Sequence, residues 1–131
     1  MGPDGRRHIS YYDLTNGDLK YARCAASCAA AASWEKGTIR SAGITGFTPS
    51  LAVGTNGRVH VSFYSVTGGA LFYLSCATNC TTASSWSGAL LDGRSTLDAG
   101  KWNSLALARN QVLVSYYDET NGNLKYVEHT P

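Results

Sequence analysis

The stretch "HISYYDLTNGDLKYARCAASC" (residues 8–28) decides the fold, because most of it occurs again later in the chain. "HVSFYSVTGGALFYLSCATNC" (residues 60–80) follows 52 residues further on, and "LVSYYDETNGNLKYVEHT" begins at Leu113. Self-similarity at a period of about 20 to 50 residues is typical of solenoids, propellers and other repeat arrays. The repeat therefore organises the whole chain of 131 residues.

Each copy predicts a β-hairpin followed by further strands. "HISYY" and "LKYA" flank an Asn-Gly or Gly-Gly dipeptide (residues 16–17, 68–69 and 121–122), and such dipeptides favour a type I′ turn with positive φ at both central positions. A strand led by Trp34 or Trp86 follows the hairpin, and an apolar strand over residues 49–54 or 103–108 precedes the next one. Four strands per repeat of about 50 residues are typical of a β-propeller blade. The alternative is a β-sandwich of two duplicated halves.

We therefore expect an all-β fold of β-propeller blades, built from four-stranded antiparallel repeats of 52 residues, with an incomplete ring in one chain. A partial blade would occupy residues 1–41 without its first strand, a full blade residues 42–92, and a partial blade residues 93–131 without its fourth strand. Unpaired strand edges favour association. The predicted partner is a second copy of the chain, in a dimer or trimer; truncation from a longer array is the alternative explanation of the open edges.

Composition argues against several other partners. The net charge is only +2, so the dense basic stripe typical of nucleic-acid binding is missing. The sequence contains no apolar run near the roughly 20 residues that span a bilayer, so we expect no membrane insertion. The start, "MGPDGRRHIS", is polar and does not resemble a signal peptide.

The motifs "HISYYDLTNGDLKYARCAASC" and "TPSLAVGTNGRVHVSFYS" resemble tandem repeats of large bacterial secreted or surface proteins. Those repeats read approximately G-x-x-H-I-S-Y-Y-D-x-T-N-G-D-L-K-Y-A, followed by a cysteine pair, a tryptophan and a T-S-L-A segment. The resemblance covers nearly the whole chain and implies β-propeller architecture and export, but no activity. The layout of out-of-phase blades on a short chain is also similar to that of small oligomeric propeller lectins.

Four cysteines form two C-x-x-x-C pairs at equivalent places in the repeat, Cys24 with Cys28 and Cys76 with Cys80. Structural zinc usually uses shorter knuckles that converge on one ion, so we expect two local disulfides and no metal or other cofactor. Two reduced thiol pairs are the alternative. Disulfides form in oxidising compartments, which indicates a secreted or cell-surface protein.

Candidate catalytic residues do not recur in all three copies of the repeat, as the residues of a repeated site should. His8 and His60 match each other, but Leu113 replaces them in the third copy, which favours a packing role. Asp13 and Asp118 match each other, but the middle copy has Ser65. The sequence has neither the G-x-S-x-G nucleophile motif nor the Asp-box of sialidases. We therefore expect a non-catalytic protein.

The residues that do recur suit carbohydrate binding. Aromatic rings stack on the apolar face of a sugar, and carboxylates accept hydrogen bonds from its hydroxyls. The candidate ligand-binding residues are Tyr12, Asp13, Trp34, Tyr64, Trp86, Tyr117 and Asp118. Core packing is the competing interpretation of these rings, with the two tryptophans wedged between blades. The sequence thus favours a scaffold or interaction module that assembles through open blade edges; a multivalent, lectin-like carbohydrate-binding propeller is the alternative, and an enzyme comes third.

Overall fold

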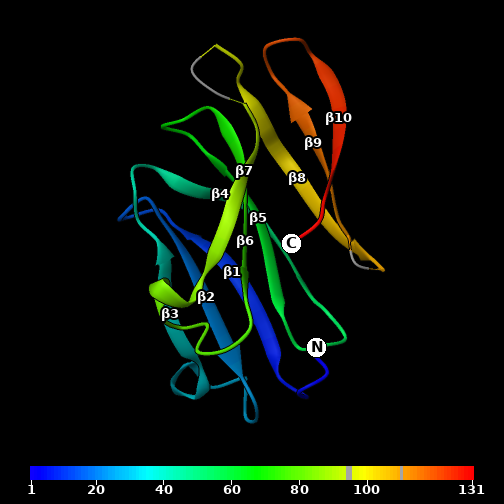
Figure 1. The fold of residues 1–131 in the computed structure, drawn as a ribbon. Helices are drawn as coiled ribbons and strands as arrows, with labels where there is room; N and C mark the ends of the chain where they lie inside the picture. The colour runs from blue at the N-terminus through cyan, green and yellow to red at the C-terminus, as the bar shows by residue number, and fades with distance from the viewer. Residues whose placement is uncertain (94–95, 110) are drawn as a thin grey trace.

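Ten strands in three antiparallel sheets make up the fold in a computed structural model that describes residues 1–93, 96–109 and 111–131 (Figure 1). In every sheet, strands that follow one another in the chain are neighbours. The first sheet contains β1 (Arg7–Asp13), β2 (Asp18–Cys24) and β3 (Glu35–Arg40). The second contains β4 (Thr45–Val53), β5 (Val59–Ser65), β6 (Ala70–Cys76) and β7 (Ser87–Gly93). The third contains β8 (Ala99–Ala108), β9 (Gln111–Asp118) and β10 (Asn123–His129). The all-β prediction is confirmed.

Two short 3₁₀ helices precede the tryptophan-led strands. They are η1 (Ala31–Ser33) and η2 (Ala83–Ser85), and each ends directly before a tryptophan. Each indole N–H donates to a backbone carbonyl six residues earlier: Trp34 to Cys28 at 3.0 Å and Trp86 to Cys80 at 2.8 Å. The loop after each hairpin is thereby tied to the strand that follows it.

The hairpin turns differ from the predicted type I′ geometry. Four residues, not two, separate the last paired positions of each hairpin, as between Asp13 and Asp18. Only the last residue of each loop has a positive φ: Gly17 at 73°, Gly69 at 58° and Gly122 at 68°. A four-residue loop built around a right-handed turn needs one left-handed residue before the second strand, whereas a type I′ turn needs two.

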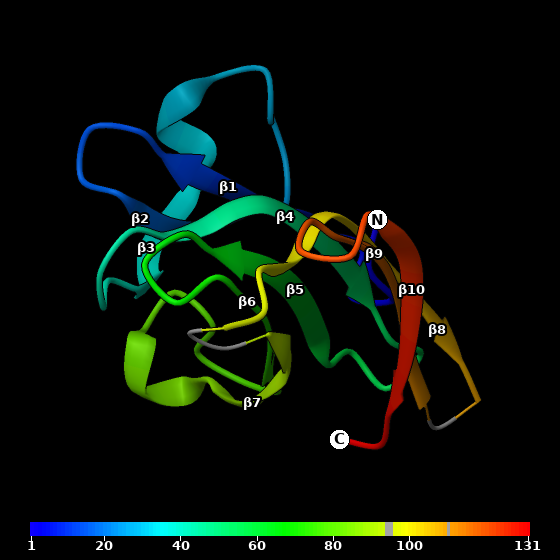
Figure 2. The same ribbon diagram turned by 90° about the horizontal axis from the view of Figure 1, so that it is seen from above.

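The second sheet lies between the other two and packs against both (Figure 2). One of its faces contacts the first sheet in a core of buried residues that includes Leu19, Tyr21, Ile39, Val59, Val61, Phe63 and Leu74. The other face contacts the third sheet in a core that includes Leu71, Tyr73, Leu105, Val112, Val114 and Tyr116. Every residue of β5 is buried because both faces of this sheet are covered. Among the residues that the structure describes, the first and third sheets have one covered face each.

Two glycines let the sheets cross closely. Gly46 on β4 lies against Leu19 on β2, and Gly100 on β8 lies against Leu71 on β6. A Cβ atom at Gly100 would lie 2.6 Å from the Leu71 Cβ, and the φ of Gly100 is 116°. No other residue fits there without displacing a strand. A close contact between a glycine and a leucine therefore sets the distance between the sheets at both junctions.

Candidate functional site

Two strand edges lack the neighbour that the repeat supplies elsewhere. In the second sheet, β5 pairs with β4 and β6 pairs with β7. Among the residues that the structure describes, β1, the counterpart of β5, pairs only with β2, and β10, the counterpart of β6, pairs only with β9. The side of β1 away from β2 and the side of β10 away from β9 thus expose unpaired backbone groups.

The turn before β1 copies the turn between β4 and β5. The same hydrogen bond closes residues 2–6 and residues 54–58: in each segment, the N–H of the first residue donates to the carbonyl of the fifth at 2.8 Å. In both turns a side-chain oxygen, from Asp4 or Asn56, accepts from the backbone N–H two residues later at 3.0 Å. The chain thus forms the turn next to β1 although no described strand pairs on that side of β1.

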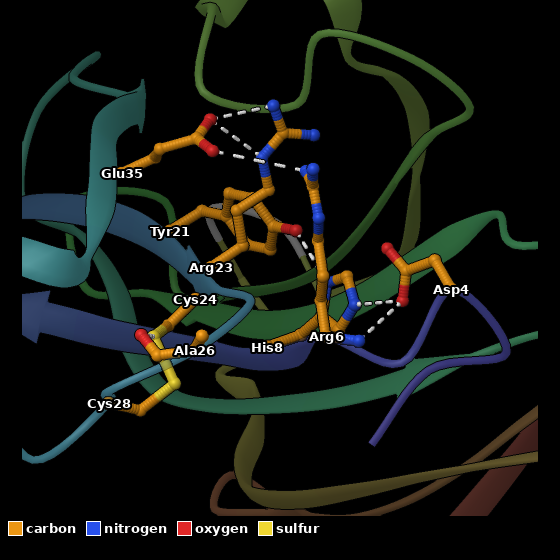
Figure 3. A network of polar contacts seen from close by, with 9 residues as sticks. All are labelled: Asp4, Arg6, His8, Tyr21, Arg23, Cys24, Ala26, Cys28 and Glu35. Atoms are coloured by element: carbon orange, nitrogen blue, oxygen red, sulfur yellow. Dashed lines mark hydrogen bonds and ion pairs between the residues drawn. A yellow bond between two sulfur atoms is a disulfide. The ribbon is translucent and has the colours of Figure 1, made fainter.

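A polar network surrounds this end of the first sheet (Figure 3). His8 Nδ1 lies 2.6 Å from the hydroxyl of Tyr21, and His8 Nε2 lies 3.2 Å from an Asp4 carboxylate oxygen. Arg23 on β2 donates two hydrogen bonds, at 2.9 and 2.7 Å, to Glu35 on β3. Burial raises the pKa of Tyr21 to about 12, so its hydroxyl stays protonated. The network joins the preceding turn and the three strands of the sheet.

The histidine-tyrosine pair recurs in the second sheet without a carboxylate. His60 Nδ1 lies 2.6 Å from the hydroxyl of Tyr73, and both side chains are buried. Burial, and then the charge of Arg58, lower the pKa of His60. An inaccessible pair of this kind supports packing, as the replacement of the histidine by Leu113 in the third copy indicated.

Two tyrosine-carboxylate-lysine clusters join the second and third sheets. Tyr64 donates to Asp98 at 2.6 Å, and Lys101 lies 3.0 Å from the same carboxylate. In the second cluster, Tyr116 and Lys125 both lie 2.5 Å from one oxygen of Asp92. Burial acts to raise the pKa of Asp92 and Asp98, but the hydrogen bonds from lysine and tyrosine outweigh it and hold both pKa values below the usual range. The charged side chains of both clusters are only partly buried, so their hydrogen bonds to the buried hydroxyls of Tyr64 and Tyr116 are the contacts that join the two sheets.

Asp13 and Asp118, predicted as ligand acceptors, lie at the hairpin turns. The Asp13 carboxylate accepts from the backbone N–H of Thr15 at 3.1 Å and from the amide side chain of Asn16 at 2.8 Å. Asp118 accepts in the same way from the backbone and side chain of Asn121, at 3.0 and 2.9 Å. Hydrogen bonds from these asparagines lower the pKa of both aspartates. Both carboxylates are therefore already engaged within the chain.

The predicted aromatic residues lie at different sheet junctions. Tyr12 packs edge-on against Phe47 of the second sheet, with ring centroids 5.5 Å apart. Trp86 packs on Tyr21 of the first sheet at the same distance, so it does wedge between sheets. Trp34 faces a shallow hollow with Ile9 and Lys36 on the outer face of the first sheet, so the predicted wedge is wrong for Trp34 within one chain. Tyr64 is buried and Tyr117 half-buried, and the structure does not bring the set together as one site.

The cysteines form the two predicted disulfides, Cys24–Cys28 and Cys76–Cys80. Across the described ranges, no three His, Cys, Asp or Glu side chains come together in a way that could hold a metal ion. Those same ranges contain no helix with the length and apolar character needed to cross a membrane.

A groove of about 730 Å³ lies between the turn before β5 and the adjoining ends of β8 and β9. Its polar lining includes Arg58, His60, Arg109 and Gln111. The guanidinium groups would suit an anionic ligand, but His60 is turned to Tyr73 and Arg58 donates to Ser75 at 3.3 Å. The polar side chains that line the groove therefore do not converge on one point where a ligand could bind.

Comparisons with known proteins bear on the fold alone. No family model and no curated protein matches the chain. Among solved structures, it is similar to a bifunctional GH43-CE protein of Bacteroides eggerthii, with a TM-score of 0.53 and 13% sequence identity over 95% of this chain. The chain spans only 18% of that protein.

Sequence reasoning missed the side chains that join the sheets. Phe47 stands in the second copy where Lys101 stands in the third. Lys125 matches Lys20 of the first copy but is replaced by Phe72 in the second, so the repeat did not mark either lysine as part of a sheet junction. The histidine-tyrosine pairs did carry a signal, because a tyrosine follows the histidine by 13 residues in both copies that have the histidine. No local sequence pattern indicated that side chains on the outer faces of the first and third sheets would be exposed to solvent.

Proposed function

We propose that this chain is a non-catalytic β-propeller scaffold that assembles with copies of itself through its open edges. The observation that supports this best is the comparison of equivalent strands: in the part of the chain that the structure describes, β1 and β10 lack the partners that β5 and β6 have. Unpaired edges of this kind template pairing with another chain unless they are covered. In this proposal the three sheets act as blades, and several copies complete the ring that one chain leaves open.

The two disulfides support the export of this scaffold. Structural disulfides persist in oxidising compartments and are rare in the cytosol. Cys76 and Cys80 are buried at the junction of the first and second sheets, so the pair contributes to the packing of the unit. A secreted or cell-surface setting follows, with self-association as the basic activity.

Light scattering across the micromolar range tests the proposal, with amide hydrogen exchange as the second readout. We expect a stable oligomer, and slow exchange along β1 and β10 that becomes fast on dilution. Strands β3 and β7 also lie at sheet edges, but each is the fourth strand of its repeat, so their exchange serves as the internal control. A monomer at every concentration would overturn the proposal.

Carbohydrate binding is the second candidate function, and one observation favours it. Trp34 lines a hollow of about 330 Å³ with Ile9, Tyr11 and Lys36 on an outer sheet face. An aromatic platform beside a polar group suits a pyranose ring. A glycan array separates the candidates: retention that Trp34→Ala abolishes supports binding, and an array without signal contradicts it.

A further inference from the structure

The sheets stack by one scheme that the chain uses twice. The leading face of a sheet is the face that packs on the next sheet along the chain; in the second sheet it carries His60, Ser62, Tyr64, Leu71 and Tyr73. The trailing face packs on the preceding sheet; in the second sheet it carries Val59, Val61, Phe63, Leu74 and Trp86. Among the described residues, nothing packs in this way on the leading face of the third sheet or on the trailing face of the first.

The leading face of the third sheet keeps the residues of a buried face. Leu124 occupies the repeat position of Leu19 and Leu71, which are both 0% exposed, yet Leu124 itself is 83% exposed. Tyr126 occupies the position of Tyr21 and Tyr73, which are 0% and 1% exposed, yet it is 69% exposed. Two large apolar side chains side by side on a sheet face mark an interaction surface.

The trailing face of the first sheet is also uncovered and also keeps the residues of a buried face. Ile9 is 44% exposed, whereas Val61 and Val114 at the same repeat position are 0% exposed. Trp34 occupies the position of Trp86, which packs on Tyr21 of the preceding sheet, but Trp34 faces the open hollow. This face thus has the apolar residues of a junction and no sheet of its own chain against it among the described residues.

We infer that the leading face of the third sheet packs on the trailing face of the first sheet of a second copy, head to tail. This inference rests on the proposed self-assembly and assigns the contact between copies to two sheet faces, in addition to the open strand edges. The two junctions within the chain are the template: they place Leu124 in the core of the new junction and Tyr126 against the partner's Trp34, as Tyr21 packs on Trp86. Glu128 on the leading face and Arg7 on the trailing face are both exposed and have opposite charges, which favours this pairing.

The contact is heterologous, because each copy contributes a different surface. Such contacts generate closed rings or open chains, whereas a two-fold dimer would use one surface twice. A variant with one blocked face therefore still keeps the other face intact. Two variants blocked on opposite faces must complement each other.

The experiment uses Ile9→Asp, which blocks the trailing face, and Leu124→Asp, which blocks the leading face. We expect each variant alone to be a folded monomer, with its fold checked by circular dichroism. An equimolar mixture should give a heterodimer and nothing larger, because one intact leading face meets one intact trailing face. Leu14→Asp, at a hairpin-turn leucine that is 82% exposed, is the matched control and should keep the wild-type mass.

Each other outcome has a defined meaning. Variants that keep the wild-type mass, a mixture that stays monomeric, or a single variant that still dimerises would each overturn the head-to-tail contact while self-assembly itself stands. A monomeric wild type would instead overturn the proposed function. If Ile9→Asp does not fold, Ile9→Gln takes its place, and Tyr126→Asp repeats the test on the leading face.

Discussion

The hydroxyl of Tyr116 on β9 lies 2.5 Å from a carboxylate oxygen of Asp92 on β7, which joins the third sheet to the second. Lys125 contacts the same oxygen, and these partners lower the pKa of Asp92 against the effect of burial. A carboxyl whose pKa is lower in the folded state contributes stability above its unfolded pKa, and that contribution is lost as the pH falls through the folded pKa. The stabilisation by Asp92 is therefore fully present at neutral pH and declines as the pH falls below about 4.

We expect Asp92→Asn to lower the free energy of unfolding at pH 7 by about 1 to 3 kcal/mol, because the buried hydroxyl of Tyr116 and the partly exposed ammonium of Lys125 lose a charged acceptor. The difference from wild type should shrink toward pH 3. Urea unfolding at fixed protein concentration measures both effects. Glu119→Gln, at an exposed carboxyl, is the control, and an equal loss in both variants would contradict the role of Asp92.

Gly100→Ala should separate the second and third sheets. The new methyl group would overlap Leu71, and the φ of 116° adds backbone strain for any residue with a side chain. We expect a loss of more than about 3 kcal/mol, or failure to fold. Gly57→Ala is the matched control, since Gly57 also has a positive φ but nothing lies within 4 Å of its added Cβ. Similar losses at both glycines would show that backbone conformation alone is responsible.

His60 predicts a loss of stability in mild acid. Its pKa is lowered in the folded state by burial, so the unfolded chain takes up a proton first as the pH falls below about 6.5. Stability should decrease from pH 7 to pH 5.5 by at most about 1.4 kcal/mol per pH unit. His60→Leu, which copies the residue of the third repeat, should flatten this part of the profile. A profile as steep as that of wild type would assign the effect to other groups.

The two disulfides should differ in their resistance to reductant. Cys76 and Cys80 are 0% and 4% exposed at a sheet junction, whereas Cys28 is only half-buried. We expect mild reduction followed by alkylation and peptide mapping to label Cys24 and Cys28 first. Each bond closes a short loop and should stabilise the fold by about 2 kcal/mol. Equal labelling of all four cysteines at low reductant would contradict the difference in burial.

Asp13→Ala together with Asp118→Ala separates the turn role from ligand binding. The carboxylates already accept hydrogen bonds from residues of their own turns, so we expect a lower melting temperature and unchanged glycan retention. Thermal unfolding and a glycan array are the two measurements. Loss of retention at an unchanged melting temperature would instead support the aspartates as ligand acceptors.

Local sequence determined the elements of this protein. The repeated strand segments on either side of an Asn-Gly or Gly-Gly dipeptide placed the hairpins, and equal cysteine spacing in two copies indicated both disulfides, because each depends on residues close together in the chain. The turn type was mistaken because an Asn-Gly dipeptide fits either a two-residue loop or the end of a four-residue loop. Strand register, set by side-chain contacts, decided between them.

Tertiary structure alone decided which repeated residues are buried. Leu19 and Leu124 both lie two residues after a loop glycine and directly before a Lys-Tyr pair, yet Leu19 is fully buried and Leu124 is largely exposed. Burial of a sheet face depends on whether another sheet lies against it, and no local pattern encodes the number of sheets that follow. The tyrosine-aspartate hydrogen bonds of the second junction likewise join residues more than 20 positions apart. The repeat thus determined the surfaces, and the stacking order determined which two of them remain open.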